Sequence, residues 1–313
     1  MSRVKHYLKT ALCALYKYSG LAPLQEHLTR WAGRRFMVIL LFHRVSDAVK
    51  EDGLTVGTAR FRRMCALLRH RFHVVPLGEV FRILRERLPI PPRTVAVTFD
   101  DCYRDNLIAA RILAETQLPA CFFLPTDFVG TDHVFPWDQA LPRLPNLTWD
   151  DVREMARMGF EIGSHTVTHA NFGTISVEQA RRELAVSRTV LEEKLGQPVR
   201  WFAYPYGGVN NFRPELLPLL EETGYQGGLS GHGGFIYPGA DARLLPREAV
   251  PYFKSILNLE LHLAGVLNWM YALKRRLGLQ PPILPDPEQG AAGRAAESAA
   301  PVVPVGQVSM SNR

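Results

Sequence analysis

Two groups of polar residues follow apolar runs in this sequence. Asp100 and Asp101 close one run, and His165 and His169 follow another. Four-residue spacing lets two imidazoles converge on one ion, and a neighbouring carboxylate can complete the ligand set. We therefore predict that Asp101, His165 and His169 bind a metal and leave a position open for water. That number of ligands is typical of a catalytic metal site.

Each group also has a simpler explanation. A pair of aspartates often forms a solvated turn or caps a helix, and a single histidine is usually structural. Both groups, however, follow predicted strands, whose carboxyl ends meet at one face of a parallel barrel. This shared position favours a common site.

From Phe36 onward, short β-rich runs alternate with helical patterns. Such alternation predicts an α/β fold with a parallel sheet and helical crossovers. About seven strands without evident edge protection favour closure into a distorted (β/α) barrel. The expected strands span 36–42, 94–99, 119–124, 160–164, 199–204, 225–230 and 244–250.

Two helices have recognisable ends. Ser176 and Gln179 form a predicted capping box, and Gly196 ends that helix. Pro214 is expected to open a second helix, which Gly224 would close. Both helices lie between predicted strands, as the crossover connections of a parallel sheet require.

The chain is expected to contain one domain and two flanking segments. Residues 1–35 form a basic amphipathic segment, residues 36–278 the catalytic domain, and residues 279–313 a disordered tail rich in Pro, Ala and Gly.

The charge is concentrated at the N-terminus. Seven basic residues and one acidic residue before Phe36 account for +6 of the net +7. The nearly neutral remainder argues against a nucleic-acid partner. A basic helix over 4–18 could contact anionic lipid or pack on the domain, and the sequence does not separate the two.

Compartment and assembly are only partly indicated. Four cysteines without regular spacing favour a reducing compartment, and no convincing secretory signal or membrane span is visible. We therefore expect a cytoplasmic protein, with peripheral contact at the inner membrane face as an alternative. The sequence does not indicate an oligomeric state.

Together the motifs resemble those of the NodB-homology polysaccharide deacetylases, carbohydrate esterase family 4. That family carries a TFDD-type motif, an HTxxH-type motif and a motif ending in Pro-Tyr-Gly, which match residues 98–101, 165–169 and 205–207. The resemblance covers roughly residues 36–250. It implies that Asp100 is the general base and that the Tyr206 backbone N–H helps to hold the oxyanion. The three ligands that it implies are those already predicted.

The proton donor departs from the common pattern. The family usually supplies a histidine from a late Leu-x-His motif, but His262 lies in an amphipathic stretch and is expected to be structural. His43 ends the first predicted strand, and some family members carry the motif there by circular permutation. A ring of strands has no unique first member, so His43 is the predicted general acid. The alternative is a histidine that simply ends the strand.

Two further departures concern the base. Cys102 replaces the usual glycine after the aspartate pair and is expected to be a small buried thiol. Ala203 stands where the family commonly has the arginine that orients the base. Arg247, at the end of the last predicted strand, is the predicted substitute, and a surface position is the alternative.

The predicted activity is removal of N-acetyl groups from a GlcNAc-type sugar in a polysaccharide, oligosaccharide or lipid-linked precursor. The cofactor would be one divalent metal ion, with Zn²⁺ favoured by ligand type and Co²⁺, Ni²⁺ or Mn²⁺ as alternatives. Two rival functions remain: a deformylase or deacetylase of a lipid-linked sugar at the membrane surface, and a catalytically silent glycan-binding protein.

Overall fold

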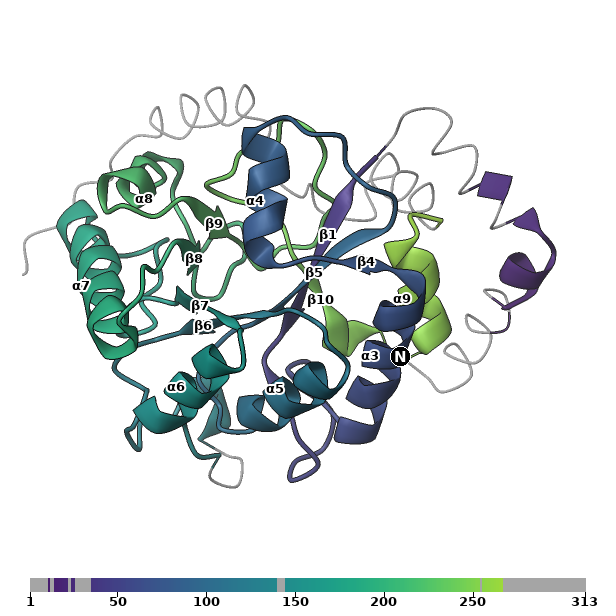
Figure 1. Ribbon diagram of the computed structural model, residues 1–313. Helices are drawn as coiled ribbons and strands as arrows, with labels where there is room; N and C mark the ends of the chain where they lie inside the picture. The colour runs from purple at the N-terminus through teal and green to yellow at the C-terminus, as the bar shows by residue number, and fades with distance from the viewer. Residues whose placement is uncertain are drawn as a thin grey trace, which may run out of the picture.

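The computed structural model describes residues 11, 14–21, 24–25, 35–139, 144–253 and 255–266. Its main sheet contains seven parallel strands in the order β10-β1-β5-β6-β7-β8-β9, with the short β4 added to β5 (Figure 1). The seven strands curl into a distorted barrel, as predicted. They span Met37–Phe42 (β1), Thr94–Phe99 (β5), Cys121–Leu124 (β6), Glu161–Ser164 (β7), Trp201–Ala203 (β8), Gly227–Leu229 (β9) and Glu248–Ala249 (β10). Residues His73–Val74 form β4, and Arg44–Val45 (β2) pairs with Thr55–Val56 (β3) in a separate small sheet.

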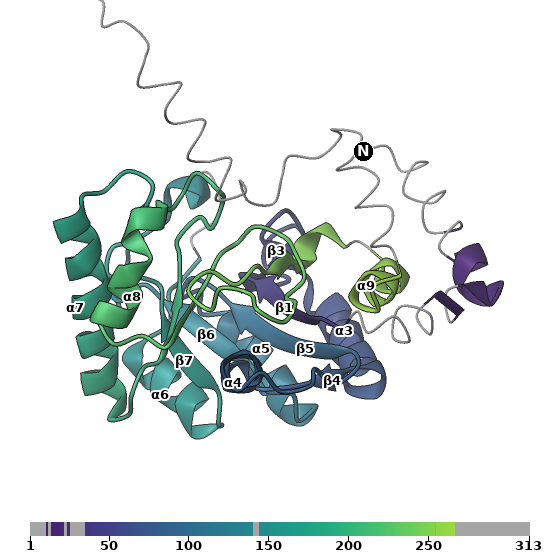
Figure 2. The ribbon, with the colours of Figure 1, turned by 90° about the horizontal axis from the view of Figure 1, so that it is seen from above.

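Helices surround the sheet in the two views (Figures 1 and 2). The α-helices span Thr58–Arg71 (α3), Leu77–Arg85 (α4), Asn106–Glu115 (α5), Trp149–Arg157 (α6), Val177–Leu195 (α7), Pro218–Glu222 (α8) and Ile256–Leu263 (α9). Short 3-10 helices span Pro136–Asp138 (η1), Pro214–Leu216 (η2) and Val250–Tyr252 (η3).

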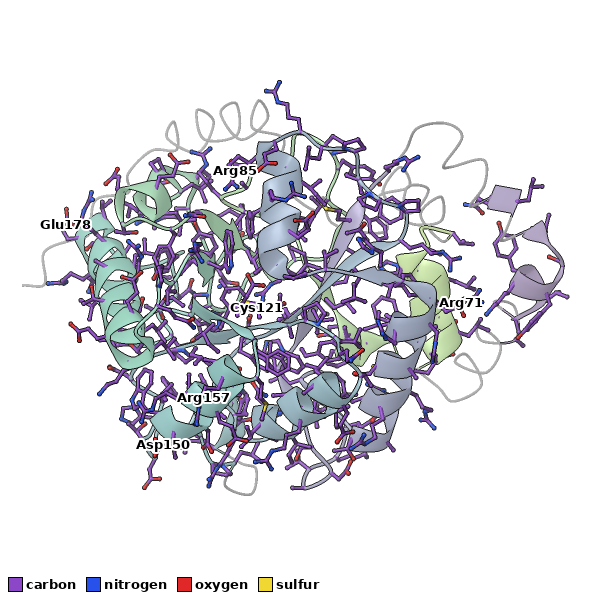
Figure 3. All side chains as sticks on the ribbon, in the orientation of Figure 1. Arg71, Arg85, Cys121, Asp150, Arg157 and Glu178 are labelled. Carbon is purple, nitrogen blue, oxygen red and sulfur yellow. The ribbon has the colours of Figure 1, made fainter. Side chains whose placement is uncertain are left out.

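The centre of the sheet is fully buried and largely apolar. Both β1 and β5 are buried along their whole length, and they pair residue for residue from Met37 with Thr94 to Phe42 with Phe99. A strand buried on both faces is a continuous apolar run, because helices cover each side. Figure 3 shows Cys121 of β6 in this interior, whereas Arg85, Asp150 and Glu178 lie at the periphery.

The segment 242–249 bridges β9, which is the last strand in the order of the sheet, and β1, which lies near its other end. Its first part contacts β9, where the Leu245 N–H donates to the Gly228 carbonyl and the Ser230 N–H donates to the Leu245 carbonyl, each at 2.9 Å. Its second part is β10, which pairs with Leu40 and Leu41 of β1. One stretch of chain therefore bonds to both β9 and β1.

The predicted elements exist, with shorter bounds in most cases. The capping box of α7 is present, because Ser176 and Gln179 each accept from the other's backbone N–H, and Gly196 ends the helix at φ 65°. The predicted helix between Pro214 and Gly224 is divided into η2 and α8. Pro218 at the start of α8 cannot donate a backbone hydrogen bond to the preceding turn, which explains the division.

Only part of the predicted N-terminal segment is described. Within it, Tyr16 packs against a small apolar cluster on α9 that includes Leu261. The Lys17 ammonium lies 2.6 Å from a carboxylate oxygen of Glu260, and Gln25 donates to the Val266 carbonyl at 2.9 Å. Residues 279–313, the predicted disordered tail, lie outside the described residues. No helix in the described part of the chain is long and apolar enough to span a membrane.

Candidate active site

Asp100 and Asp101 leave β5 at its carboxyl end and are both buried. The Asp100 N–H donates to the Phe42 carbonyl at 2.9 Å, which continues the β1–β5 ladder by one residue. Asp101 then adopts a positive φ of 68°, a conformation that few residues other than glycine adopt. This turn directs two adjacent carboxylates into one site, although neighbouring side chains of a regular strand point apart.

His165 and His169 come from the loop that follows β7. The His165 N–H donates to the Leu124 carbonyl of β6 at 3.0 Å, which fixes the start of the loop. Thr166 and His169 both have positive φ, at 73° and 59°. Glu183 of α7 accepts hydrogen bonds from the backbone of Val167 and Thr168 at 2.7 and 3.0 Å. The helix therefore holds a strained loop in the shape that brings the two imidazoles together.

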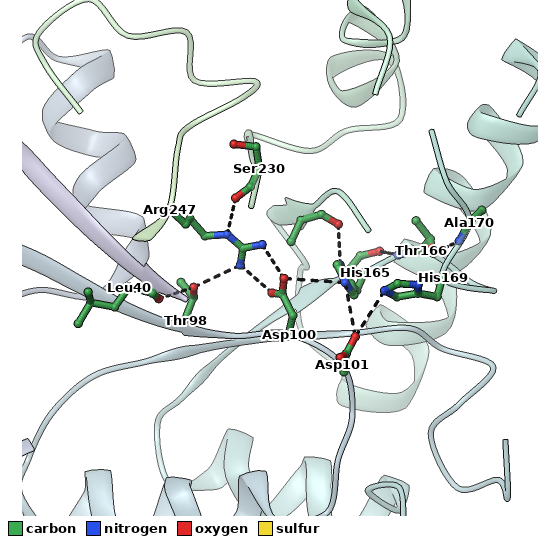
Figure 4. A network of polar contacts seen from close by, with 12 residues as sticks. Leu40, Thr98, Asp100, Asp101, His165, Thr166, His169, Ala170, Ser230 and Arg247 are labelled. Atoms are coloured by element: carbon green, nitrogen blue, oxygen red, sulfur yellow. Dashed lines mark hydrogen bonds and ion pairs between the residues drawn. The ribbon is translucent and has the colours of Figure 1, made fainter. Parts of the chain in front are cut away.

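Asp101, His165 and His169 meet as predicted, with candidate ligand atoms within 4.8 Å of one another (Figure 4). Asp101 Oδ1 lies 3.7 Å from His165 Nε2 and 3.4 Å from His169 Nε2. His165 Nδ1 lies 2.8 Å from the Ala203 carbonyl, which can only accept, so Nδ1 carries the proton and Nε2 presents a lone pair.

The electrostatics of these three residues fit a divalent cation. Burial, and then the nearby charges of Asp100 and Asp138, raise the pKa of Asp101 well above its usual value. Burial lowers the pKa of His165, and burial followed by the charge of His165 lowers that of His169 to about 2. Both imidazoles are thus neutral at neutral pH, as metal ligands must be. Within the described residues, both carboxylate oxygens of Asp101 are buried and have no hydrogen-bond donor. A bound cation would satisfy them.

Arg247 reaches Asp100 from the segment before β10. The two guanidinium nitrogens lie 2.6 and 2.5 Å from the two carboxylate oxygens, and Nε donates to the Ser230 carbonyl at 2.7 Å (Figure 4). Burial alone would raise the pKa of Asp100, but the charge of Arg247 and then of His165 lowers it below its usual value. Asp100 is therefore ionised at neutral pH and can accept a proton. The alternative of a surface arginine is wrong, because Arg247 is 0% exposed.

His43 follows β1 and lies within electrostatic range of Asp100 and Arg247. Burial lowers its pKa to about 4, only partly opposed by the charge of Asp100. Its Nδ1 is buried and has no partner among the described residues. The imidazole is therefore neutral in the resting protein and must gain a proton before it can act as an acid. Its role as general acid stays a prediction.

Tyr206 lies beside the candidate ligands. Its backbone has a positive φ of 61°, and its ring, 51% exposed, lies 4.8 Å from the imidazole of His169 between ring centres. Gly207 follows at φ 61°, and a Cβ there would come within 2.2 Å of the Gly231 nitrogen. The loop therefore requires glycine at that position. The oxyanion role of the Tyr206 N–H is a further prediction.

The other residues singled out in the sequence have structural roles. His262 is buried in α9, and its Nε2 lies 3.3 Å from a carboxylate oxygen of Glu248. Cys102 is a fully buried thiol whose pKa burial raises. Ala203 is buried in β8 and contributes its carbonyl to His165.

Sequence reasoning missed a network of buried polar side chains behind the metal site. Arg44 Nη1 lies 2.5 Å from an Asp138 oxygen, and the Tyr103 hydroxyl donates to the other oxygen. Trp137 Nε1 donates to the Tyr103 hydroxyl at 3.0 Å. The sequence carried no local signal for this network, because Arg44 and Asp138 are 94 residues apart in the chain.

The comparisons with known proteins agree with this geometry. A family profile described as polysaccharide deacetylase matches residues 88–228. YxkH of Bacillus subtilis, a polysaccharide deacetylase by name, is 28% identical over 207 residues, which make up 66% of this chain and 66% of that protein. The poly-beta-1,6-N-acetyl-D-glucosamine N-deacetylase of Escherichia coli K12 is 28% identical over 224 residues, covering 61% of this chain and 33% of its own length. The matched region thus spans about two thirds of one relative and one third of the other.

Solved structures share the fold. The deacetylase PplD of Streptococcus pyogenes, in complex with acetate, has a TM-score of 0.62 and 23% identity over 72% of this chain and 96% of its own. IcaB from Ammonifex degensii has a TM-score of 0.61 and 22% identity over 73% and 97%. These structures show a shared fold. The profile match over residues 88–228 and the likeness to YxkH, together with the buried Asp-His-His triad and the adjacent Asp100 at the carboxyl ends of β5 and β7, lead to one conclusion: the chain belongs to the polysaccharide deacetylase family.

Proposed function

We propose that this protein is a metal-dependent hydrolase that removes N-acetyl groups from a GlcNAc-type sugar of a glycan. One observation carries the proposal: an ionised carboxylate, Asp100, is held by Arg247 directly beside the three candidate ligands. A base next to an electrophilic site is the arrangement that hydrolysis of an amide requires. The name of the Escherichia coli relative supports an N-acetylated glucosamine polymer as substrate.

Asp101, His165 and His169 would hold the cation. Two imidazoles and a carboxylate are typical ligands of Zn²⁺ but also suit Co²⁺, Ni²⁺ and Mn²⁺. When bound, a divalent cation lowers the pKa of water and polarises a carbonyl oxygen. No other group of at least three His, Cys, Asp or Glu ligands occurs among the described residues.

The side chains around the triad account for the proton transfers. Asp100 accepts a proton from the attacking water, whose oxygen forms a bond to the acetamide carbon. The Tyr206 N–H donates to the oxygen on which negative charge develops. His43, neutral at rest, first takes up a proton from solvent and then gives it to the nitrogen as the C–N bond breaks, because an amine leaves only when protonated. Acetate and a free amino sugar result.

The proposal is tested by acetate release from N-acetylglucosamine oligomers and from poly-β-1,6-N-acetylglucosamine. We expect Asp100→Asn to lose at least about a hundredfold in rate, which is the lower range for a general base. Asp150→Asn, on the exposed face of α6, is the matched control and should retain full activity. Equal rates in Asp100→Asn and the native protein would reject Asp100 as the base, and no release by the native protein from either substrate would reject the activity.

A second candidate is deformylation or deacetylation of a lipid-linked sugar at a membrane surface. It is favoured by four exposed apolar side chains in the N-terminal segment: Leu15, Tyr18, Leu21 and Leu24 are 69, 80, 52 and 54% exposed. An apolar surface on a basic segment is typical of helices that bind anionic membranes. Flotation with vesicles containing anionic lipid, with and without residues 1–35, tests it. Equal flotation of both proteins would reject this contact.

Metal analysis distinguishes the proposed enzyme from a catalytically silent glycan-binding protein. If purified protein neither retains nor rebinds a divalent metal and still binds glycan, the silent reading is favoured. Metal binding together with turnover would eliminate it.

A further inference from the structure

Trp137 lies at the edge of the metal site. Its ring centre is 5.3 Å from that of the ligand His169 and 5.8 Å from that of Tyr206, in both cases edge to face. Its side chain is 36% exposed, and that of Tyr206 is 51% exposed. Two accessible aromatic side chains therefore adjoin the candidate metal site.

A relay of polar contacts holds Trp137. The indole N–H donates to the Tyr103 hydroxyl, which donates to Asp138, and Asp138 also accepts from Arg44. Tyr103, Asp138 and Arg44 are 2, 5 and 1% exposed.

The inner end of the relay is also anchored. Arg44 donates through Nε to the Thr55 hydroxyl at 2.9 Å and through Nη2 to Asp52 at 2.8 Å, and its guanidinium lies 5.3 Å from the centre of the Tyr103 ring. Each guanidinium nitrogen of Arg44 thus has a partner. A buried arginine paired in this way resists displacement, because breaking one contact leaves a charge unpaired.

Apolar contacts support Trp137 on one face. Phe135 stacks on the indole at 4.9 Å and 13°, and Phe128 stacks on Phe135 at 4.3 Å and 13°. A cavity of about 450 Å³ adjoins this stack and is lined in part by Tyr103, Phe135 and Asp138. The hydrogen bond to Tyr103 and the stacking on Phe135 together fix the orientation of the indole.

We propose that Trp137 and Tyr206 form an aromatic wall that binds a pyranose ring of the N-acetylated glycan, and that Tyr103, Asp138 and Arg44 are positioning residues for Trp137. The apolar C–H face of a pyranose packs well on an aromatic ring, and ligand sites commonly combine such surfaces with a few polar groups. The inference rests on the proposed function, since it identifies how that site holds its substrate.

The substrate test uses acetate release from N-acetylglucosamine pentamer by the zinc-loaded full chain. We expect Trp137→Ala to raise KM about tenfold, the equivalent of 1.4 kcal/mol, and Trp137→Phe to recover much of the loss. Tyr103→Phe keeps the ring and removes only the hydroxyl, so KM should rise several-fold while kcat stays within about twofold. Trp149→Phe, on α6, is the control and should leave KM unchanged.

A measurement without substrate tests the relay. In protein labelled with 5-fluorotryptophan, the fluorine resonance of Trp137 is identified by its loss in Trp137→Phe. Tyr103→Phe should shift or broaden that resonance, and an unchanged resonance would overturn the relay.

The outcomes separate this inference from the proposed function. If the native protein turns over the pentamer and Trp137→Ala has the native KM, the aromatic wall is wrong and the proposed function stands. If the native protein neither binds nor deacetylates the pentamer or the β-1,6-linked polymer, the proposed function fails and the wall fails with it.

Discussion

Arg247 and Asp100 form a two-pronged ion pair with nitrogen–oxygen distances of 2.6 and 2.5 Å, although 147 residues separate them in the chain. Both side chains are buried, and Arg247 is also held by the Ser230 carbonyl and the Thr98 hydroxyl. The pair fixes the orientation of one carboxylate while Asp101, the next residue, faces the histidines. Two adjacent aspartates thereby have different environments, which supports the different roles that we propose for them.

Arg247→Gln should move the acidic limb of the pH–rate profile to higher pH. Arg247 lowers the pKa of Asp100, so its loss leaves burial unopposed, and the carboxylate ionises only at higher pH. We expect kcat/KM at pH 7 to fall by about a hundredfold. Arg243→Gln, whose partner Asp241 is on the surface, is the matched control. An unchanged limb in Arg247→Gln would contradict the role of the pair.

Asp101→Asn should abolish stabilisation by metal. A ligand at 100 times its Kd stabilises by about 2.7 kcal/mol, which corresponds to an increase in Tm of roughly 5–10 °C for a domain of this size. Differential scanning calorimetry with and without Zn²⁺ should show this increase for the native protein and for Asp150→Asn. An equal increase in Asp101→Asn would show that zinc binds elsewhere. Without metal, Asp101→Asn should be at least as stable as the native protein, because the carboxylate oxygens have no donor among the described residues.

His43→Ala should slow turnover without loss of metal. Removal of a general acid costs about 10²–10⁴-fold in rate, whereas His43 is not among the three candidate ligands. Steady-state kinetics together with zinc content measure both effects. His70→Ala, an exposed histidine of α3, is the control. A kcat within about twofold of native would show that the amine receives its proton from another group.

Glu161→Ala should destabilise the fold and spare the chemistry. Glu161 begins β7, at the opposite end from the metal ligands, and accepts from the N–H groups of Leu77 and Gly78 and from the Trp201 indole, at 2.7, 3.1 and 2.9 Å. Loss of these contacts should lower the free energy of unfolding by about 1–3 kcal/mol. Chemical denaturation measures it, with the exposed Glu178→Ala as control. A change in kcat/KM of more than about threefold would contradict the expectation that this end of the barrel supports the fold and the other end the chemistry.

The sequence predicted the parts of the site that depend on local pattern. Asp100 and Asp101 could be placed because they end a continuous apolar strand, and His165 and His169 because their spacing lies within one loop. Arg247 could be proposed but not positioned, since its contact with Asp100 depends on how segment 242–249 bonds to both β9 and β1.

Other features depend on tertiary contacts that leave little local signal. The two-residue strands β2 and β3 are too short for a periodic pattern, so the sequence indicated no role for Arg44, which lies within β2. Its pairing with Asp138, 94 residues away, exists because the loop after β6 folds over it. The low pKa of His43 also could not be predicted from the sequence, because the burial of a ring at a strand end depends on the elements packed around it.

The central claim is that the Asp-His-His triad and Asp100 together hydrolyse N-acetyl groups. Acetate release from N-acetylglucosamine oligomers and from poly-β-1,6-N-acetylglucosamine, measured after chelation and again after addition of one equivalent of Zn²⁺, tests it most directly. We predict that chelation abolishes release and that Zn²⁺, or another of the candidate metals, restores it in the native protein but not in Asp101→Asn. Undiminished release from the fully chelated protein, or equal restoration in Asp101→Asn, would contradict the account.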